Sequence, residues 1–101
     1  MTEQSEDPST PDVIDNDLHS RIELVRGDER AQLVYRVDDG RLVLEHTEVP
    51  ESWGGQGIGG RLVEAALVKA AREGLEVDAQ CPFAARWIER HPDEVAATRE
   101  R

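Results

Sequence analysis

Three short runs in the first half of the chain alternate apolar and polar side chains, as strands with one buried face do. They cover residues 19–26, 31–37 and 41–49. The dipeptide Asp39-Gly40 separates the last two runs and favours a tight type I′ turn, because both central residues of that turn need positive φ. The third run becomes polar over residues 45–48, which fits either a strand that approaches a functional site or a strand with an exposed end. We therefore predict an antiparallel meander.

From Ile58 onward the apolar residues recur every third or fourth position, which is the period of a helix with one buried face. Gly74 ends this pattern and is a common residue just beyond a helix. A short strand is predicted over residues 75–79, and the crossover helix makes it parallel to the third run. Pro82 suits the first turn of a second helix, and a short helix is expected from residue 93. The predicted fold class is α+β (mixed α/β): an antiparallel meander, a crossover helix, a parallel strand and a second helix.

The N-terminal end of the chain is acidic and poor in apolar residues. Residues 1–17 contain six acidic side chains, two prolines and no Lys or Arg. Such a segment buries too little apolar surface to offset the entropy lost on ordering. We predict a disordered acidic tail over residues 1–17, one domain over residues 18–96 and a frayed C-terminus over residues 97–101.

The whole chain of 101 residues carries a formal net charge of −10. This charge argues against nucleic acid and anionic membranes as partners, and it suits a cationic amine. Cys81 is the single cysteine, so an internal disulfide is excluded and a reducing cytoplasm is the expected location. No apolar run reaches about 20 residues and no signal-peptide pattern is present, so we expect a soluble protein. The oligomeric state stays open.

Five of the seven residues from Gly54 to Gly60 are glycines, directly before and within the start of the predicted crossover helix. Glycine adds nothing to a core and costs backbone entropy, so the run indicates a backbone that turns tightly and presents bare N–H groups. The free N–H groups and the positive dipole end of the helix would add to them. This combination predicts a phosphate cradle. A flexible connection is the alternative, although it would need only one or two glycines.

Two other phosphate-binding motifs share features with this run. Residues 55–60 satisfy G-x-G-x-x-G, but a dinucleotide fold needs a buried parallel strand before that motif and further βα units after it. A P-loop needs Lys and Ser/Thr after its second glycine, and Gly59 is followed by Gly60 and Arg61 instead. Both alternatives are therefore excluded.

A third motif fits. It is carried by Val49-Pro50, the run from Gly54 to Gly59, Cys81-Pro82-Phe83 and His91-Pro92. The order and spacing of these segments resemble the GNAT acetyltransferase superfamily, in its minimal YjdJ-type form, over residues 20–95. Gly54 stands where the acyl-CoA loop of that family usually has Arg or Gln. The resemblance implies acetyl-CoA as the cofactor, no metal, and a set of residues that contact the coenzyme. These are Thr47, Glu48, Val49, Gly54, Gly55, Gln56, Gly57, Ile58, Gly59 and Gly60.

The resemblance also implies an N-acetyltransferase that moves an acetyl group from acetyl-CoA to an unidentified amine acceptor. That reaction needs a base for the amine and a proton for the leaving thiolate. His46 and Glu48 are the candidate bases, and strand alternation places them on one face and Glu45 on the other. Cys81 is a candidate acid or acetyl-accepting nucleophile, with a small buried hydrophobe as the other interpretation. Ile88 occupies the position of a Tyr in larger relatives, so a non-catalytic CoA-binding or protein-interaction module is the alternative function.

Overall fold

The computed structural model describes residues 13–99, which form a five-stranded sheet and three α-helices. The strands are β1 (Val13–Asn16), β2 (Arg21–Arg26), β3 (Glu29–Asp38), β4 (Arg41–Glu48) and β5 (Glu76–Ala79). The α-helices are α1 (Ile58–Glu73), α2 (Pro82–Arg90) and α3 (Pro92–Arg99), and the short 3₁₀ helices are η1 (Asp17–His19) and η2 (Glu51–Trp53). The α+β class predicted from the sequence is confirmed.

The strands lie in the order β1-β2-β3-β4-β5, and every neighbouring pair is antiparallel except β4 and β5. The chain crosses the sheet through α1 between these two strands, so they run parallel, as predicted. The turn between β3 and β4 also follows the prediction, with φ of 54° at Asp39 and 77° at Gly40. The register of the meander is thereby set by its turn.

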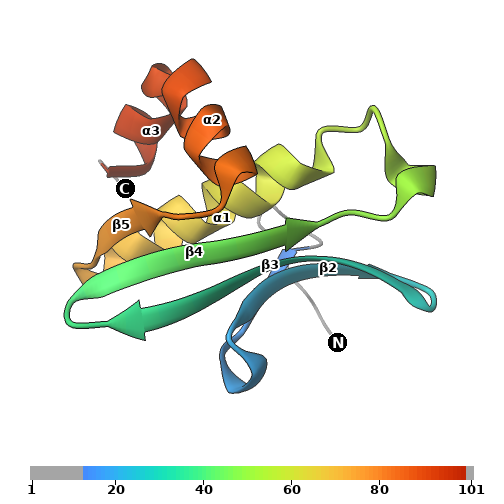
Figure 1. The fold of residues 1–101 in the computed structure, drawn as a ribbon, viewed down its shortest axis with the longest axis horizontal. Coiled ribbons are helices and arrows are strands. Elements are labelled where there is room, and N and C mark those ends of the chain that lie inside the picture. The colour runs from blue at the N-terminus through green and yellow to red at the C-terminus, as the bar shows by residue number, and fades with distance from the viewer. Residues whose placement is uncertain (1–12, 100–101) are drawn as a thin grey trace, which may run out of the picture.

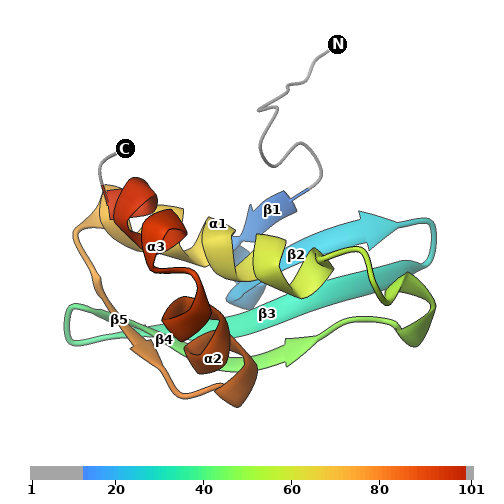
Figure 2. The same ribbon diagram turned by 90° about the horizontal axis from the view of Figure 1, so that it is seen from above.

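Within residues 13–99, the three α-helices lie on one face of the sheet and the opposite face carries no α-helix (Figure 1). Figure 2, which views the molecule from the helical side, shows that α1 lies across the strands. The core fills the space between α1 and the sheet, and its fully buried side chains include Leu24, Leu33, Leu44, Leu62 and Val63. No helix of this described region has the length and apolar character needed to cross a membrane.

The predicted domain start at residue 18 is wrong, because an additional strand precedes it. β1 pairs with β2 in a register that runs from Val13 opposite Leu24 to Asn16 opposite Arg21. The 3₁₀ helix η1 follows directly and connects β1 to β2. Residues 13–17 therefore belong to the fold, and the rest of the predicted tail, residues 1–12, lies outside the described residues.

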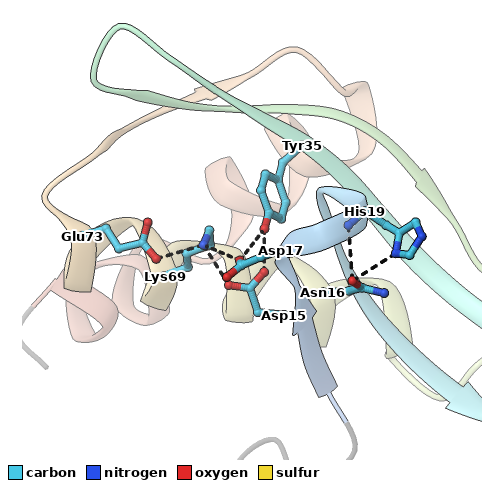
Figure 3. A network of polar contacts seen from close by, with 7 residues as sticks. All are labelled: Asp15, Asn16, Asp17, His19, Tyr35, Lys69 and Glu73. Atoms are coloured by element: carbon cyan, nitrogen blue, oxygen red, sulfur yellow. Dashed lines mark hydrogen bonds and ion pairs between the residues drawn. The ribbon is translucent and has the colours of Figure 1, made fainter.

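Lys69 of α1 is the centre of a polar network that ties β1 and η1 to the helix (Figure 3). Its Nζ donates to Asp15 Oδ2 at 2.8 Å and to Glu73 Oε2 at 2.9 Å, and it lies 3.4 Å from Asp17 Oδ1. The Tyr35 hydroxyl donates to Asp15 Oδ1 at 2.6 Å. Burial alone would lower the pKa of Lys69, but the carboxylates of Asp15 and Glu73 outweigh burial and raise that pKa above its ordinary range. Lys69 therefore stays charged although its side chain is only 8% exposed.

We expect Lys69→Met to lower the free energy of unfolding by about 2 kcal/mol, because it leaves the neighbouring carboxylates without their cation. Methionine keeps most of the volume of the side chain, so the effect of lost packing is small. Urea denaturation of both proteins measures the difference. Arg72→Met is the control, since Arg72 is exposed on the same helix and should change stability by less than about 0.5 kcal/mol. Equal losses in the two variants would show that the network adds nothing specific.

Candidate functional site

The loop between η2 and α1 has backbone angles that favour glycine. Gly55 has a φ of 82° and Gly57 a φ of 70°, and Gly57 is the N-cap residue of α1. A Cβ added at either position would meet nothing within 4 Å. These two glycines are therefore favoured by the left-handed backbone, and the space beside them is open.

The first N–H groups of α1 have no acceptor inside the helix. The first intrahelical bond runs from the Arg61 N–H to Gly57 O at 3.2 Å. The N–H groups of residues 58–60 therefore have no acceptor within α1. Gly54 differs, because its N–H donates a hydrogen bond to Glu51 O at 3.1 Å, the last hydrogen bond of η2. Within the described part of the chain, no backbone acceptor pairs with the amides of residues 55–60. Together with the positive end of the α1 dipole, these amides can bind an anion.

Gly59 and Gly60 leave room for aromatic side chains of α2 to pack against α1. The glycine pattern in the sequence does not indicate this role. A Cβ on Gly59 would lie 2.7 Å from Phe83 Cζ, and a Cβ on Gly60 would lie 2.5 Å from Trp87 Nε1. Both distances are too short for real atoms, so α2 approaches α1 this closely only because these side chains are absent. Trp87 is also stacked on His91, with ring centroids 4.2 Å apart. Phe83 and Trp87 thereby form a fixed wall beside the helix terminus.

A groove of about 500 Å³ runs along this wall, between the glycine loop, the end of β4 and α2. It is lined by Thr47, Val49, Trp53, Gly54, Gly55, Gly57, Ile58, Gly59, Gly60, Phe83 and Trp87. The structure thus brings eight of the ten residues predicted to contact the coenzyme to one groove. Glu48 and Gln56 are not among the lining residues, and Trp53, Phe83 and Trp87 are additions.

β4 and β5 are paired only as far as Leu44 and Ala79. Leu44 O then accepts the N–H groups of Gln80 at 3.0 Å and Cys81 at 2.9 Å, and the chain leaves the sheet as α2. Residues 45–48 therefore have no strand on their β5 side within residues 13–99. The free edge of β4 can hydrogen-bond an extended ligand, as the edge of a sheet does in peptide recognition.

Cys81 is the N-cap residue of α2, next to this free edge. It is 4% exposed, and its Sγ lies 3.2 Å from Oγ1 of Thr47, which lines the groove. Burial alone would raise the pKa of the Cys81 thiol. Hydrogen bonds from the Thr47 hydroxyl and from the backbone N–H groups of Ala84 and Phe83 outweigh burial and hold the pKa below its ordinary value. The structure therefore joins Cys81 to the predicted coenzyme contact Thr47, and its role stays a prediction.

The candidate bases His46 and Glu48 lie on the opposite face of the sheet. Thr47 points toward Cys81, so strand alternation turns its two neighbours to the open face. There His46 Nε2 lies 2.9 Å from Glu48 Oε2, and both side chains are 58% exposed. Hydrogen bonds from His46 and Gln32 hold the pKa of the Glu48 carboxyl below its ordinary value. A substrate that contacts both His46 and Cys81 must therefore extend through the gap beside β4.

The expectation that Glu45 faces away from His46 is wrong, because β4 has a bulge. Leu44 and His46 pair with consecutive residues of β3, which leaves Glu45 as the extra residue. Glu45 forms an ion pair with Arg36. Arg36 follows the buried Tyr35 along β3 and thus lies on the open face. The bulge gathers Glu45 and His46 on that face and returns Thr47 to the helical side.

The hairpin between β2 and β3 holds the glycine loop in place. Trp53 of η2 is 6% exposed and donates its indole N–H to Glu29 Oε1 at 2.9 Å. The guanidinium carbon of Arg26 lies 5.0 Å from the centroid of the Trp53 ring. Arg26 Nη1 also donates to Gln56 Oε1 at 3.1 Å. Since these partners lie 24 and 30 residues apart along the chain, no local sequence pattern indicates the contacts.

Comparison with known proteins shows that the sequence matches a protein family. The sequence pattern of the GCN5-related N-acetyl-transferase family matches residues 21–98. Protein NATD1 of Gallus gallus and that of Homo sapiens are each 35% identical over 65 residues, which is 63% of this chain. The match spans 59% and 58% of those two proteins, so the chain covers about three fifths of their length. Protein NATD1 of Xenopus tropicalis is 32% identical over 92 residues, 87% of this chain and 84% of that protein.

A solved structure shares the fold. The solution structure of a GCN5-like protein from Staphylococcus aureus matches with a TM-score of 0.62 and 28% sequence identity. The match covers 74% of this chain and 76% of that chain. The glycine loop, the gap beside β4 and Cys81 all lie inside the region that the family pattern covers.

Proposed function

This chain belongs to the GCN5-related N-acetyl-transferase family, and from that premise we propose that it transfers an acetyl group from acetyl-CoA to an amine. One observation carries the proposal. The amides of residues 55–60 have no backbone acceptor within the described residues, and all of these residues except Gln56 line a groove that reaches Thr47 beside Cys81. An anionic donor with a long, extended arm suits this arrangement. The net charge of −10 suits a cationic acceptor.

The residues of the groove fit acetyl-CoA. The amides of residues 55–60 would hold its diphosphate, because bare N–H groups at a helix N-terminus favour negative charge. Gly55 and Gly57 leave open space for the phosphate oxygens. The pantetheine arm would hydrogen-bond the free edge of β4 at Thr47 and the backbone of Val49 just beyond the strand, and both residues line the groove. Backbone groups of successive residues point to opposite edges of a strand, so those of Glu48, which pairs with Gln32 of β3, would not reach the arm.

Bound acetyl-CoA supplies an acetyl thioester, and the protein has to supply a proton to the thiolate that leaves. We assign this task to Cys81, whose Sγ–H would protonate the departing thiolate. Its lowered pKa makes the thiol a better proton donor, and the contact of 3.2 Å with Thr47 Oγ1 fixes the position of the sulfur. The alternative role, as an acetyl-accepting nucleophile, uses the same atom, and the two roles differ in the pH dependence of kcat that they predict.

On the open face, His46 and Glu48 would prepare the acceptor. The lowered pKa of Glu48 keeps it a carboxylate, and its contact of 2.9 Å with His46 Nε2 holds the imidazole ring in place. His46 would take a proton from the ammonium group, since the imidazole of histidine is the side chain that most often acts as a general base. Lys69 is the single lysine of the chain and is held by carboxylates inside the fold, so it is not the acceptor.

The proposal is tested by measuring thiol release from acetyl-CoA with and without a panel of amines. The panel contains a polyamine, a peptide with a lysine side chain and a peptide with a free N-terminus. We expect amine-dependent release by at least one of these acceptors, with calorimetric titration confirming that acetyl-CoA binds. Binding without release for any amine would favour a non-catalytic CoA-binding module. Absence of binding would refute the proposal.

A further inference from the structure

The glycine loop carries no basic side chain of its own. From residue 51 to residue 60 the only charged residue is Glu51, which is negative. Backbone amides and the helix dipole supply only partial positive charge, about half an elementary charge at a helix N-terminus. A diphosphate carries full negative charges, so a cation from elsewhere in the fold would complete the site.

Arg26, at the end of β2, is a cation that the fold brings to this loop from a distant part of the chain. Its Nη1 donates to Gln56 Oε1 at 3.1 Å, and Gln56 lies between the two left-handed glycines, Gly55 and Gly57. The Arg26 side chain is exposed, and among the described contacts Gln56 is its only hydrogen-bond partner. A guanidinium group has five N–H donors in a planar fork. Most of them therefore remain available to an anion beside the loop.

The guanidinium group also rests on a rigid support. Its central carbon lies 5.0 Å from the centroid of the Trp53 ring, and Trp53 is fixed by burial and by its hydrogen bond to Glu29. Arg30, on the same hairpin, differs, because its Nε lies 3.9 Å from Glu23 Oε1 on the open face of the sheet. A stacked guanidinium loses less side-chain entropy when it binds an anion, because its orientation is already restricted.

We propose that Arg26 binds the diphosphate of acetyl-CoA and supplies the positive charge that the loop lacks at Gly54. This inference rests on the proposed function, since it concerns the same ligand. Arg26 would thus bind the acetyl donor, although it lies 28 positions before Gly54, where the glycine run begins. Arg26 would contact the diphosphate and take no part in the transfer of the acetyl group.

The test is calorimetric titration of the full chain with acetyl-CoA, comparing the wild type with Arg26→Ala and with the control Arg30→Ala. We expect Arg26→Ala to raise Kd about tenfold, the effect of one exposed charge-assisted hydrogen bond, and to weaken the dependence of Kd on salt. Arg30→Ala removes the same charge from the same hairpin and should change Kd less than about twofold. Arg26→Lys should recover part of the loss, because it keeps the charge without the planar fork.

A second donor separates charge recognition from mere support of the loop. S-acetylpantetheine has the thioester and the pantetheine arm but no diphosphate. Arg26→Ala should lower kcat/KM with acetyl-CoA far more than with S-acetylpantetheine. The amide resonances of residues 55–60 in the free variant should stay at their wild-type positions, whereas a disordered loop would move them. If Arg26→Ala binds acetyl-CoA as tightly as the wild type, or if both donors suffer equally, the inference is wrong. Failure of the wild type to bind acetyl-CoA would instead refute the proposed function.

Discussion

Gly57→Asp should weaken the binding of acetyl-CoA about 100-fold. Gly57 lines the groove, and a side chain at this position would enter open space beside the amides of α1. A carboxylate there would lie close to the bound diphosphate. Two unit charges about 5 Å apart repel by roughly 2–3 kcal/mol at an effective dielectric constant of about 25, which corresponds to about two orders of magnitude in Kd. Calorimetric titration measures the change directly.

Two control variants separate repulsion from backbone strain. Gly57→Asn has nearly the same shape as Gly57→Asp without the charge, and both residues tolerate positive φ better than other side chains do. We expect it to weaken binding only about tenfold. Gly74→Asp adds the same charge at the other end of α1, where φ is 68° and a Cβ would meet nothing within 4 Å. It should leave Kd nearly unchanged, and equal effects of Gly57→Asp and Gly57→Asn would contradict an anion site at this loop.

Most of the fold follows from local sequence patterns. The two-residue period and the Asp39-Gly40 turn predict β3 and β4, and the helical period that starts at Ile58 and stops before Gly74 predicts α1 with its observed ends. Each of these elements is decided by residues next to one another in the chain. The parallel pairing of β4 and β5 then follows from the crossover rule rather than from any residue.

β1 could not be predicted, because its stability depends on a distant partner. Asp15 makes residues 13–16 resemble a solvated acidic tail, and its charge is matched by Lys69, which lies 54 residues further along the chain. A count of local charges cannot include that cation. The network in Figure 3 therefore explains why a strand forms in a segment whose composition is typical of disorder.

The candidate site shows the same division between local and distant information. The glycine run indicates an anion cradle by itself. The contact between Thr47 and Cys81 joins residues 34 positions apart, and it depends on the bulge at Glu45, which turns Thr47 toward α2. A single inserted residue reverses the alternation of a strand beyond it, so alternation alone separates Glu45 from His46 and Glu48, although the bulge places all three on the open face. The packing of Phe83 and Trp87 on Gly59 and Gly60 is equally invisible, since glycines with two different roles look the same in the sequence.

Cys81→Ala should lower kcat about 100-fold and leave the Kd of acetyl-CoA unchanged within about twofold. The thiol is proposed to protonate the leaving thiolate, and loss of a positioned acid typically costs two to four orders of magnitude in rate. Its Sγ contacts Thr47 Oγ1 at the side of the groove, so binding of the donor should not depend on the sulfur. Steady-state kinetics with a saturating amine, together with calorimetric titration, separates the two effects. If turnover is unchanged, Cys81 is a structural residue.

The pH dependence of kcat distinguishes a proton donor from a nucleophile. An acid is active only as the thiol, so kcat should fall as the pH rises through the pKa of Cys81. The lowered pKa places that fall at a lower pH than the value of about 8.5 for an ordinary cysteine. Thr47→Val removes a hydrogen bond that stabilises the thiolate, and it should therefore move the fall to higher pH while keeping the shape of the side chain. A nucleophile would behave in the opposite way: kcat would rise through the same pKa, and acetylated Cys81 would accumulate, visible by mass spectrometry, when the amine is omitted.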